Sequence, residues 1–454
     1  MDSITEALER LVDDAADVFS AALTEALPDD SEGEVQLRDL ERATSQVMQR
    51  IGQRFLCVLI ESCQPEEPAE RISCRCGGQA EYVRHRIGTV ITMMGQVDVS
   101  RAYYLCATCH QGTYPLDEQL GFCAGGLSAA LQEALAVTGI HLPFELAGDL
   151  FERLTGVSIS DNGVRDATEQ IGQERRERDN AQIEAVWDFD KASLSASPTH
   201  VPQRLYGSID ETSVRTHERW RKPKLGCWYT TDERPPDIPP EEWEPRAEAI
   251  TYYADLTHAE DFGRLLYLTG LQRGADRATE LIFVADGAPW IWSIVEEHFP
   301  HAVQIVDWFH ATEYIWDAAH SLYGEKSDLA TAWANERLSE LWEGEIDQLL
   351  STLQKRVRPE IDEDPVQEAI TYIQNNRHRM RYPEFRAQGY QIGSGTIESG
   401  CKRVIGARLK QAGMVWTTDG VSQLIKARAM FFSGEWDDFC QQRQPPRRTY
   451  RHAS

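Results

Sequence analysis

Two hydrophobic stretches that each end in aspartate, Leu205-Tyr-Gly-Ser-Ile-Asp210 and Leu281-Ile-Phe-Val-Ala-Asp286, decide the fold of this 454-residue chain. Short apolar runs of this kind, bounded by polar residues, are typical of buried strands. Three further stretches have the same character and complete a predicted set of five strands: Gly226–Thr231, Ile250–Asp255 and Val303–Asp307. We therefore predict an α/β domain over residues 205–435.

Three acidic side chains of this domain are candidate metal ligands. Asp210 and Asp286 end their strands, and Glu398 lies where a helix is expected to begin, in Gly393-Ser-Gly-Thr-Ile-Glu-Ser-Gly-Cys401. Carboxylates at the carboxyl ends of neighbouring strands can meet at one edge of a sheet. A third carboxylate on a covering helix would complete an oxygen-rich pocket for Mg²⁺ or Mn²⁺. A single aspartate after a strand is commonly a turn former, so only the three together indicate a catalytic site.

Four motifs in this order resemble those of bacterial insertion-sequence transposases of the ISKra type, which are relatives of the Mutator-like group. They are Ser208-Ile-Asp-Glu-Thr212, Val284-Ala-Asp-Gly-Ala288, Asp307-Trp-Phe-His310 and the glycine-rich motif around Glu398. The resemblance implies a ribonuclease-H-like catalytic core over 205–435, with a helical insertion over 313–384.

The same resemblance implies a DDE transposase in which Asp210, Asp286 and Glu398 hold two Mg²⁺ or Mn²⁺ ions. Its chemistry would be hydrolysis of a DNA phosphodiester to free a 3′-hydroxyl, which then attacks target DNA; two ions about 3.5–4 Å apart suit such an in-line transfer. Asp307 and His310 are expected beside the metals or as DNA-positioning residues, with a hydrogen-bonded strand end as the alternative. A metal-dependent nuclease without strand transfer and a domesticated DNA-binding protein remain open as rivals.

The net charge of −27 and the pI near 4.9 argue, taken alone, against a nucleic-acid partner. The charge is unevenly distributed, however, because two basic clusters flank Asp210 and Glu398, with Trp220 or Trp416 available for base stacking. A solvated surface that offsets neighbouring acids is the alternative. The candidate DNA-binding residues are Arg215, Arg219, Arg221, Lys222, Lys224, Lys402, Arg403, Arg408 and Lys410.

Residues 71–117 predict a zinc-ribbon-like module. Cys74-Arg-Cys76 and Cys106-Ala-Thr-Cys109 supply the four thiolates that a structural Zn²⁺ requires. The first pair is Cys-x-Cys where a ribbon usually has Cys-x-x-Cys, which leaves substitute ligands open: Cys63, His85, His110 or Cys123. Strands are expected at Glu81–His85 and Val97–Tyr104.

Residues 125–180 predict a helix-turn-helix-like DNA-binding segment, in which Gly156 closes one helix and Ser160 caps the next. An ordinary helical hairpin is the alternative. The second helix offers side chains for DNA contact: Asn162, Arg165, Thr168 and Gln170, with Arg175, Arg176 and Arg178 beyond.

The remaining regions are assigned from their composition and hydrophobic pattern. We predict a helical N-terminal region over 1–70, a linker over 181–204 and a C-terminal tail over 436–454. No run of about 18 apolar residues occurs, so no membrane partner is expected. The expected protein is cytoplasmic and nucleoid-associated, acts as a homo-oligomer, and binds the terminal repeats of its element and target DNA.

Overall fold

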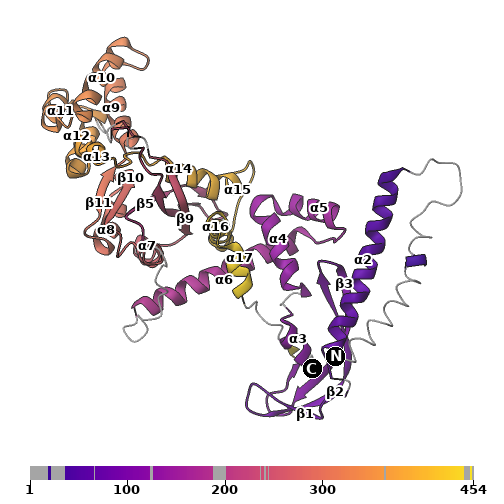
Figure 1. Cartoon of the computed structure of the whole chain (residues 1–454). Coiled ribbons are helices and arrows are strands. Elements are labelled where there is room, and N and C mark those ends of the chain that lie inside the picture. The colour runs from indigo at the N-terminus through magenta and orange to yellow at the C-terminus, as the bar shows by residue number, and fades with distance from the viewer. Residues whose placement is uncertain are drawn as a thin grey trace. The chain divides into compact units, whose positions relative to one another are not determined.

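The computed structural model (Figure 1) describes residues 19–21, 36–65, 67–122, 126–187, 201–235, 237–239, 242–243, 245–361, 364–443 and 450–451. The chain divides into two compact units, Met1–Ile171 with Phe439–Ser454, and Gly172–Asp438. Within the predicted helical region 1–70, residues 1–18 and 22–35 lie outside the described residues, as do Cys123 and the middle of the predicted linker. No described helix has the length and apolarity needed to cross a membrane.

The first unit contains an antiparallel sheet with the order β1-β2-β3-β4-β12. Its centre is the hairpin of β2 (Gln79–Thr92) and β3 (Gly95–Cys106), which confirms both predicted strands. Helix α2 (Leu37–Ser62) packs on β3, and Ile60, Val90 and Val99 are among the buried residues of this core. The remaining elements are β1 (Arg71–Ser73), β4 (Gln111–Thr113), β12 (Tyr450–Arg451) and the short α3 (Pro115–Leu120).

Part of the segment predicted as a C-terminal tail is structured. It contains helix α17 (Trp436–Gln442) and strand β12, which pairs with β4 in the sheet of the first unit.

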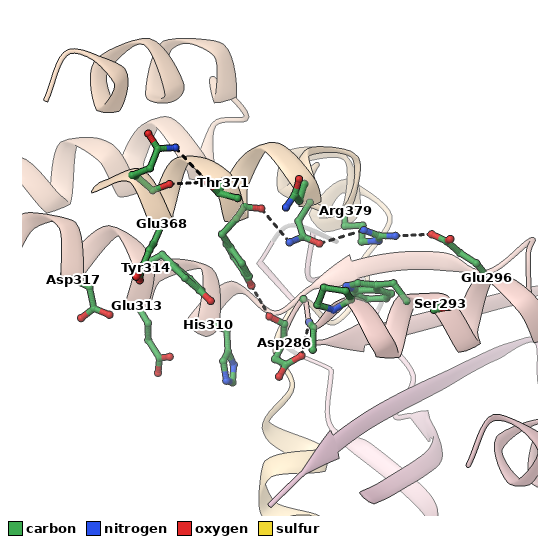
Figure 2. Close-up of a pocket in the computed structure, with 18 residues that line it drawn as sticks. Asp286, Ser293, Glu296, His310, Glu313, Tyr314, Asp317, Glu368, Thr371 and Arg379 are labelled. Atoms are coloured by element: carbon green, nitrogen blue, oxygen red, sulfur yellow. Dashed lines mark hydrogen bonds and ion pairs between the residues drawn. The ribbon is translucent and has the colours of Figure 1, made fainter. Parts of the chain in front are cut away.

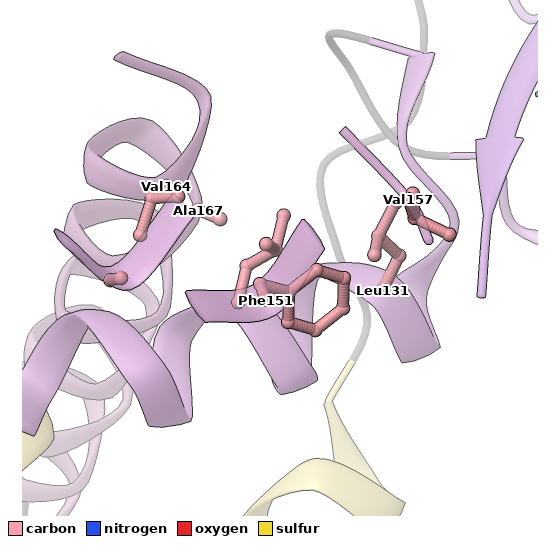
Figure 3. Close-up of a cluster of buried hydrophobic side chains, with 7 residues drawn as sticks. Leu131, Phe151, Val157, Val164 and Ala167 are labelled. Atoms are coloured by element: carbon pink, nitrogen blue, oxygen red, sulfur yellow. The ribbon is translucent and has the colours of Figure 1, made fainter. Parts of the chain in front are cut away.

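Helices α4 (Ala129–His141), α5 (Phe144–Thr155) and the start of α6 (Asp161–Trp187) enclose a second core of this unit, which Figure 3 shows. Phe151, Val157 and Val164 are buried in it. Gly156 ends α5 with a φ of 73°, a left-handed conformation that glycine adopts without strain. The Ser160 hydroxyl accepts the Gly163 N–H at 3.2 Å at the start of α6. The predicted helix–turn–helix pattern of secondary structure is therefore present, although α6 continues to Trp187.

The second unit is built on a mixed sheet with the order β11-β10-β5-β8-β9, which contains all five predicted strands. Strands β5 (Arg204–Glu211), β8 (Lys224–Thr231) and β9 (Ala247–Asp255) form an antiparallel meander. Strands β10 (Glu280–Ala285) and β11 (Val303–Val306) run parallel to β5. A small separate hairpin, β6 (Val214–Arg215) with β7 (Trp220–Arg221), lies between β5 and β8 in the chain.

Helices cover both faces of this sheet, which explains why its central strands are apolar almost throughout. On one face, Trp228 donates to Thr269 of α7 (Ala259–Arg273) at 2.9 Å. On the other face, Gly400 at the end of α14 (Gly395–Gly400) approaches Leu225, whose side chain points opposite to that of Trp228 because side chains alternate along a strand. Helix α16 (Thr418–Phe432) packs on β9, and α8 (Pro289–His298) packs on α7.

A bundle of helices, orange in Figure 1, separates β11 from α14. It occupies the region predicted as a helical insertion, although its first helix begins at Trp308. After α14 the chain forms a π-helix, η5 (Cys401–Gly406), and the short α15 (Ala407–Leu409). The bundle consists of α9 (Trp308–Tyr323), α10 (Asp328–Trp342), α11 (Ile346–Gln354), α12 (Pro365–Asn376), η4 (Arg377–Arg379) and α13 (Tyr382–Ala387).

Candidate functional site

The two predicted catalytic aspartates lie side by side at one edge of the second unit's sheet. Strands β5 and β10 are parallel neighbours in which Phe283 pairs with Gly207, so three residues further along Asp286 is level with Asp210. Burial raises the pKa of Asp210, and the negative charge of Asp286 raises it further. Such mutual repulsion is the property that a bound cation would relieve.

Glu398 reaches the same edge from α14, together with Asp307 and His310. One carboxylate oxygen of Asp307, one of Glu398 and one ring nitrogen of His310 lie within 4.8 Å of one another. The charge of His310 also interacts with those of Asp210 and Asp286. The structure therefore brings together all five residues that the motifs singled out, from three strand ends and two helix starts.

Asp307 holds this group together through both of its carboxylate oxygens. Its side chain is completely buried. Its Oδ1 accepts the Phe309 N–H at 2.6 Å, and its Oδ2 accepts from His310 Nδ1 and from the Ser394 N–H, each at 3.2 Å. Burial opposes the ionisation of Asp307, but these hydrogen bonds more than offset it and lower its pKa. Asp307 thus anchors His310 and the loop before Glu398.

His310 is a cation at this site. Its hydrogen bond to Asp307 raises the pKa of His310 to about 9, so the ring is protonated at neutral pH. A protonated imidazole donates hydrogen bonds from both ring nitrogens. Asp307 and His310 thus form a hydrogen-bonded pair beside the carboxylates, an arrangement that agrees with both alternatives expected from the sequence.

Two residues that had not been singled out complete the site. The Ser394 hydroxyl contacts Asp307 and lies 3.1 Å from Glu398 Oε1, so it links the two carboxylates. The Cys401 thiol is hydrogen-bonded to Asp210, and burial raises the pKa of Cys401, which keeps the thiol protonated as a donor. Both residues belong to the glycine-rich motif around Glu398, and their contact with strand ends far away in sequence could not be inferred from it.

The π-helix places Cys401 next to Asp210 and is supported from outside. A π-helix is rare and often marks a functional site. The buried Arg428 of α16 donates to two carbonyl oxygens of this segment, those of Val404 at 2.6 Å and Arg403 at 2.5 Å. These bonds satisfy backbone acceptors in the segment that joins Glu398 to the last helices.

Several predicted DNA-binding cations surround the carboxylates. Lys222 Nζ lies 2.7 Å from Glu211 Oε1, and Lys410 Nζ donates to the Thr212 hydroxyl, so both ammonium groups reach the residues that follow Asp210. Lys224 is partly buried and donates to the Thr257 carbonyl at 2.9 Å. Arg221 is also partly buried, and the exposed cations are Arg215, Arg219, Lys222, Lys402, Arg403 and Lys410.

Two of the predicted DNA contacts are wrong. Arg408 is completely buried, its guanidinium stacks on Trp416 at 4.9 Å, and burial lowers its pKa to about 10. Trp416 is only 8% exposed and donates to the Leu409 carbonyl at 3.1 Å, so it is not free to stack on a base. Trp220, by contrast, is 65% exposed.

Two side chains proposed for DNA contact on α6 are also wrong. Thr168 is completely buried and its hydroxyl donates to the Val164 carbonyl at 2.7 Å. Arg175 is held in ion pairs by Asp179 at 2.7 Å and Glu435 at 2.5 Å.

The four predicted zinc ligands meet in the first unit. Cys74 Sγ lies 3.7 Å from Cys109 Sγ, and Cys76 Sγ lies 3.6 Å from Cys106 Sγ. Four sulfurs around one Zn²⁺ at about 2.3 Å would be about 3.8 Å apart, so the cluster has the size of a tetrahedral site. The N–H groups of Cys109 and Thr108 help to lower the pKa of Cys106 to about 6, which favours a thiolate.

The Cys-x-Cys pair is accommodated by a tight turn in which Gly77, with a φ of 84°, donates to the Cys74 carbonyl. Of the proposed substitute ligands, Cys63 donates to the Leu59 carbonyl and His85 bonds to Tyr82, and neither they nor His110 joins the cluster.

A family model matches part of the second unit of the chain. A search of curated proteins finds no match to the chain. The model of an uncharacterised protein family, UPF0236, matches residues 271–441, a stretch that holds Asp286, Asp307, His310 and Glu398 but not Asp210.

Proposed function

We propose that the chain is a DNA transposase of the DDE kind, which cleaves DNA at element ends and joins the freed 3′-hydroxyl to a target. The observation that carries this proposal is the meeting of Asp210, Asp286 and Glu398 at one sheet edge, with Asp307 and His310 beside them. The ISKra-type resemblance of the four motifs supports it independently. The match to UPF0236 covers three of the four motifs.

The topology supports a ribonuclease-H-like core for the second unit. An antiparallel meander, β5-β8-β9, is followed by two strands that lie on the other side of β5 and parallel to it. The helical bundle of residues 308–387 interrupts this core between β11 and α14, as the resemblance implies.

Asp210, Asp286 and Glu398 would hold two Mg²⁺ or Mn²⁺ ions, and hard carboxylate oxygens suit these cations. Bound divalent ions activate water or a 3′-hydroxyl and neutralise charge on the transferring phosphate. The protonated His310, held by Asp307, would hydrogen-bond a phosphate oxygen and fix its orientation. The exposed cations around Asp210 and Glu398 would hold the flanking backbone. In each step one P–O bond forms and one breaks, so no covalent link to the protein is needed.

The first unit is proposed to recognise the element ends. Its four-cysteine cluster would bind a structural Zn²⁺, and the α4–α6 helices would contact terminal repeats. Removal of the predicted contacts Thr168 and Arg175 leaves five candidates on α6: Asn162, Arg165, Gln170, Arg176 and Arg178. We propose that the active form is a homo-oligomer, because both ends of an element must be joined to one target.

The decisive experiment incubates full-length protein with supercoiled plasmid carrying the candidate element ends and Mg²⁺ or Mn²⁺. The Asp286→Asn variant should lose cleavage and joining, whereas the matched control Asp276→Asn, at an exposed aspartate before β10, should keep both. Cleavage without joined strands would indicate a nuclease. Tight binding without metal-dependent products would indicate a DNA-binding protein and would refute the catalytic proposal.

A further inference from the structure

A cavity of about 1070 Å³ opens directly beside Asp286, between α8, α9 and α12 (Figure 2). Its floor is the Asp286-Gly-Ala turn after β10, and His310 lines it on the side of the candidate active site. A volume of this size is ample for a nucleotide-sized group. Whatever occupies the cavity would lie next to the reacting phosphate of the proposed function.

Aromatic side chains form part of the wall. Tyr314 of α9 and Tyr372 of α12 stack with their ring centroids 3.9 Å apart and their planes 17° apart. The Tyr372 hydroxyl donates to the Asp286 carbonyl at 2.6 Å, which ties this aromatic pair to the floor of the cavity. Trp292 of α8 also lines the cavity, and its buried indole N–H has no hydrogen-bond partner among the described residues.

The polar groups of the cavity match the edge of a nucleobase better than a phosphate. Helix α12 presents amide and hydroxyl side chains one turn apart, at Gln367, Thr371 and Asn375. Amide groups both donate and accept, as base edges do.

Carboxylates dominate the charge of this wall. Glu313, Asp317 and Glu368 face the cavity, while the cation Arg379 is paired with Glu296 at 2.6 Å. Clustered carboxylates repel a phosphate but accept hydrogen bonds from the exocyclic amino groups of adenine, cytosine and guanine. A base that bears such an amino group therefore suits this wall better than a phosphate does.

We propose that this cavity holds one unpaired nucleobase that bears an exocyclic amino group, turned out of the duplex next to the phosphate at Asp210, Asp286 and Glu398. This inference rests on the proposed function and adds a substrate feature to it. The base would stack against the Tyr314–Tyr372 pair, and the acceptors would include Glu368. Enzymes that extrude a base commonly hold it between aromatic side chains and read its edge by hydrogen bonds.

The test uses fluorescein-labelled 30-bp duplexes of one arbitrary sequence with a nick. One is fully paired, and the others carry a single unpaired dA or dT at the nick. Dissociation constants for the full chain are measured by anisotropy with Ca²⁺ in place of Mg²⁺. We expect the unpaired dA to bind about 5- to 140-fold more tightly than the paired duplex, because this is the affinity gained when one base stacks on an aromatic ring. The duplex with the unpaired dT should bind about tenfold more weakly than the duplex with the unpaired dA, because thymine lacks the amino donor.

Variants locate the binding position. Tyr314→Ala should abolish the gain, Tyr314→Phe should keep it, and Glu368→Gln should remove the preference for dA over dT. Gln367→Ala should weaken the gain, while the matched control Gln374→Ala, an exposed residue of the same helix outside the cavity, should not.

The proposal is overturned if unpaired dA gives no gain, or if the gain survives Tyr314→Ala. If either result is found while the paired duplex still binds in a salt-sensitive way, only the base-binding proposal fails and the proposed function is unaffected. Absence of binding to any of the duplexes would also overturn the base-binding proposal, and the proposed function would then be decided by the assay on plasmid that carries the element ends.

Discussion

Lys426 offers the sharpest test of how the second unit is held together. Its side chain is only 3% exposed, and its ammonium group lies 2.8 Å from Asp179 of α6 and 3.2 Å from Asp255 at the end of β9. Lys426→Met keeps most of the apolar stem but removes the charge. Asp179 would retain Arg175 at 2.7 Å, and Asp255 would retain the Ser422 hydroxyl at 3.1 Å.

We expect Lys426→Met to destabilise the unit by about 3–5 kcal/mol, the usual cost of leaving a buried ion pair without one partner. At about 2–4 °C per kcal/mol for a unit of this size, the melting temperature should fall by about 6–20 °C. The matched control is Lys355→Met, at an exposed lysine, which should change stability by less than about 0.5 kcal/mol. Calorimetry of the full chain measures both, and a coincident near-UV circular dichroism transition identifies the unit.

The pH dependence of stability provides a second test of the ion pairs around Lys426. Burial raises the pKa of Asp179, but the charges of Arg175 and Lys426 more than offset this and lower it. A lowered pKa stabilises the fold above the unfolded value of about 3.9, and this contribution is lost as the pH falls through the folded pKa. The gap between wild type and Lys426→Met should be constant from about pH 5 to 8 and narrow below about pH 4. A variant that melts within 2 °C of wild type at pH 7 would refute the reasoning.

Three further predictions concern the two candidate metal sites and the basic surface. Elemental analysis should find one zinc per chain, and Cys106→Ser should lose it together with the near-UV signal of the first unit; zinc retained by the variant would contradict the assignment. In metal-free protein, Asp307→Asn should lower the NMR-measured pKa of His310 from about 9 towards 6.5. Because that pKa is raised by folding, the stabilisation from the Asp307–His310 pair is complete below about pH 6.5 and lost as the pH rises through about 9. Lys222→Ala should reduce the slope of log K against log salt by about one in DNA binding, and an unchanged slope would place Lys222 outside the interface.

The strands of the second unit were predictable because their burial on both faces leaves long apolar runs in the sequence. The meeting of Asp210 with Asp286 followed from the same reasoning, since parallel neighbours end at one edge. The Cys-x-Cys pair was harder to interpret, because the turn at Gly77 depends on a backbone conformation and not on spacing alone.

The sequence did not reveal which polar side chains are buried. Arg408 carries the same charge as the exposed Arg403, yet it is buried and its guanidinium lies against the Trp416 ring. Thr168 looked like a polar residue on an exposed helix face and is instead part of a buried helix contact. Hydrogen bonds between segments that are distant in sequence, such as those of Ser394 with Asp307, could not be predicted either.

The π-helix after Glu398 changes how mutations in this segment should be tolerated. A turn of π-helix holds one residue more than a turn of α-helix. It therefore changes the direction, about the helix axis, in which residues before it point relative to residues after it. Deleting a single residue between Cys401 and Gly406 would restore α-helical phase and rotate Glu398 by about 100° relative to Lys410. The length of this short segment is therefore under tighter constraint than its composition, and insertions or deletions there should inactivate the protein more often than substitutions.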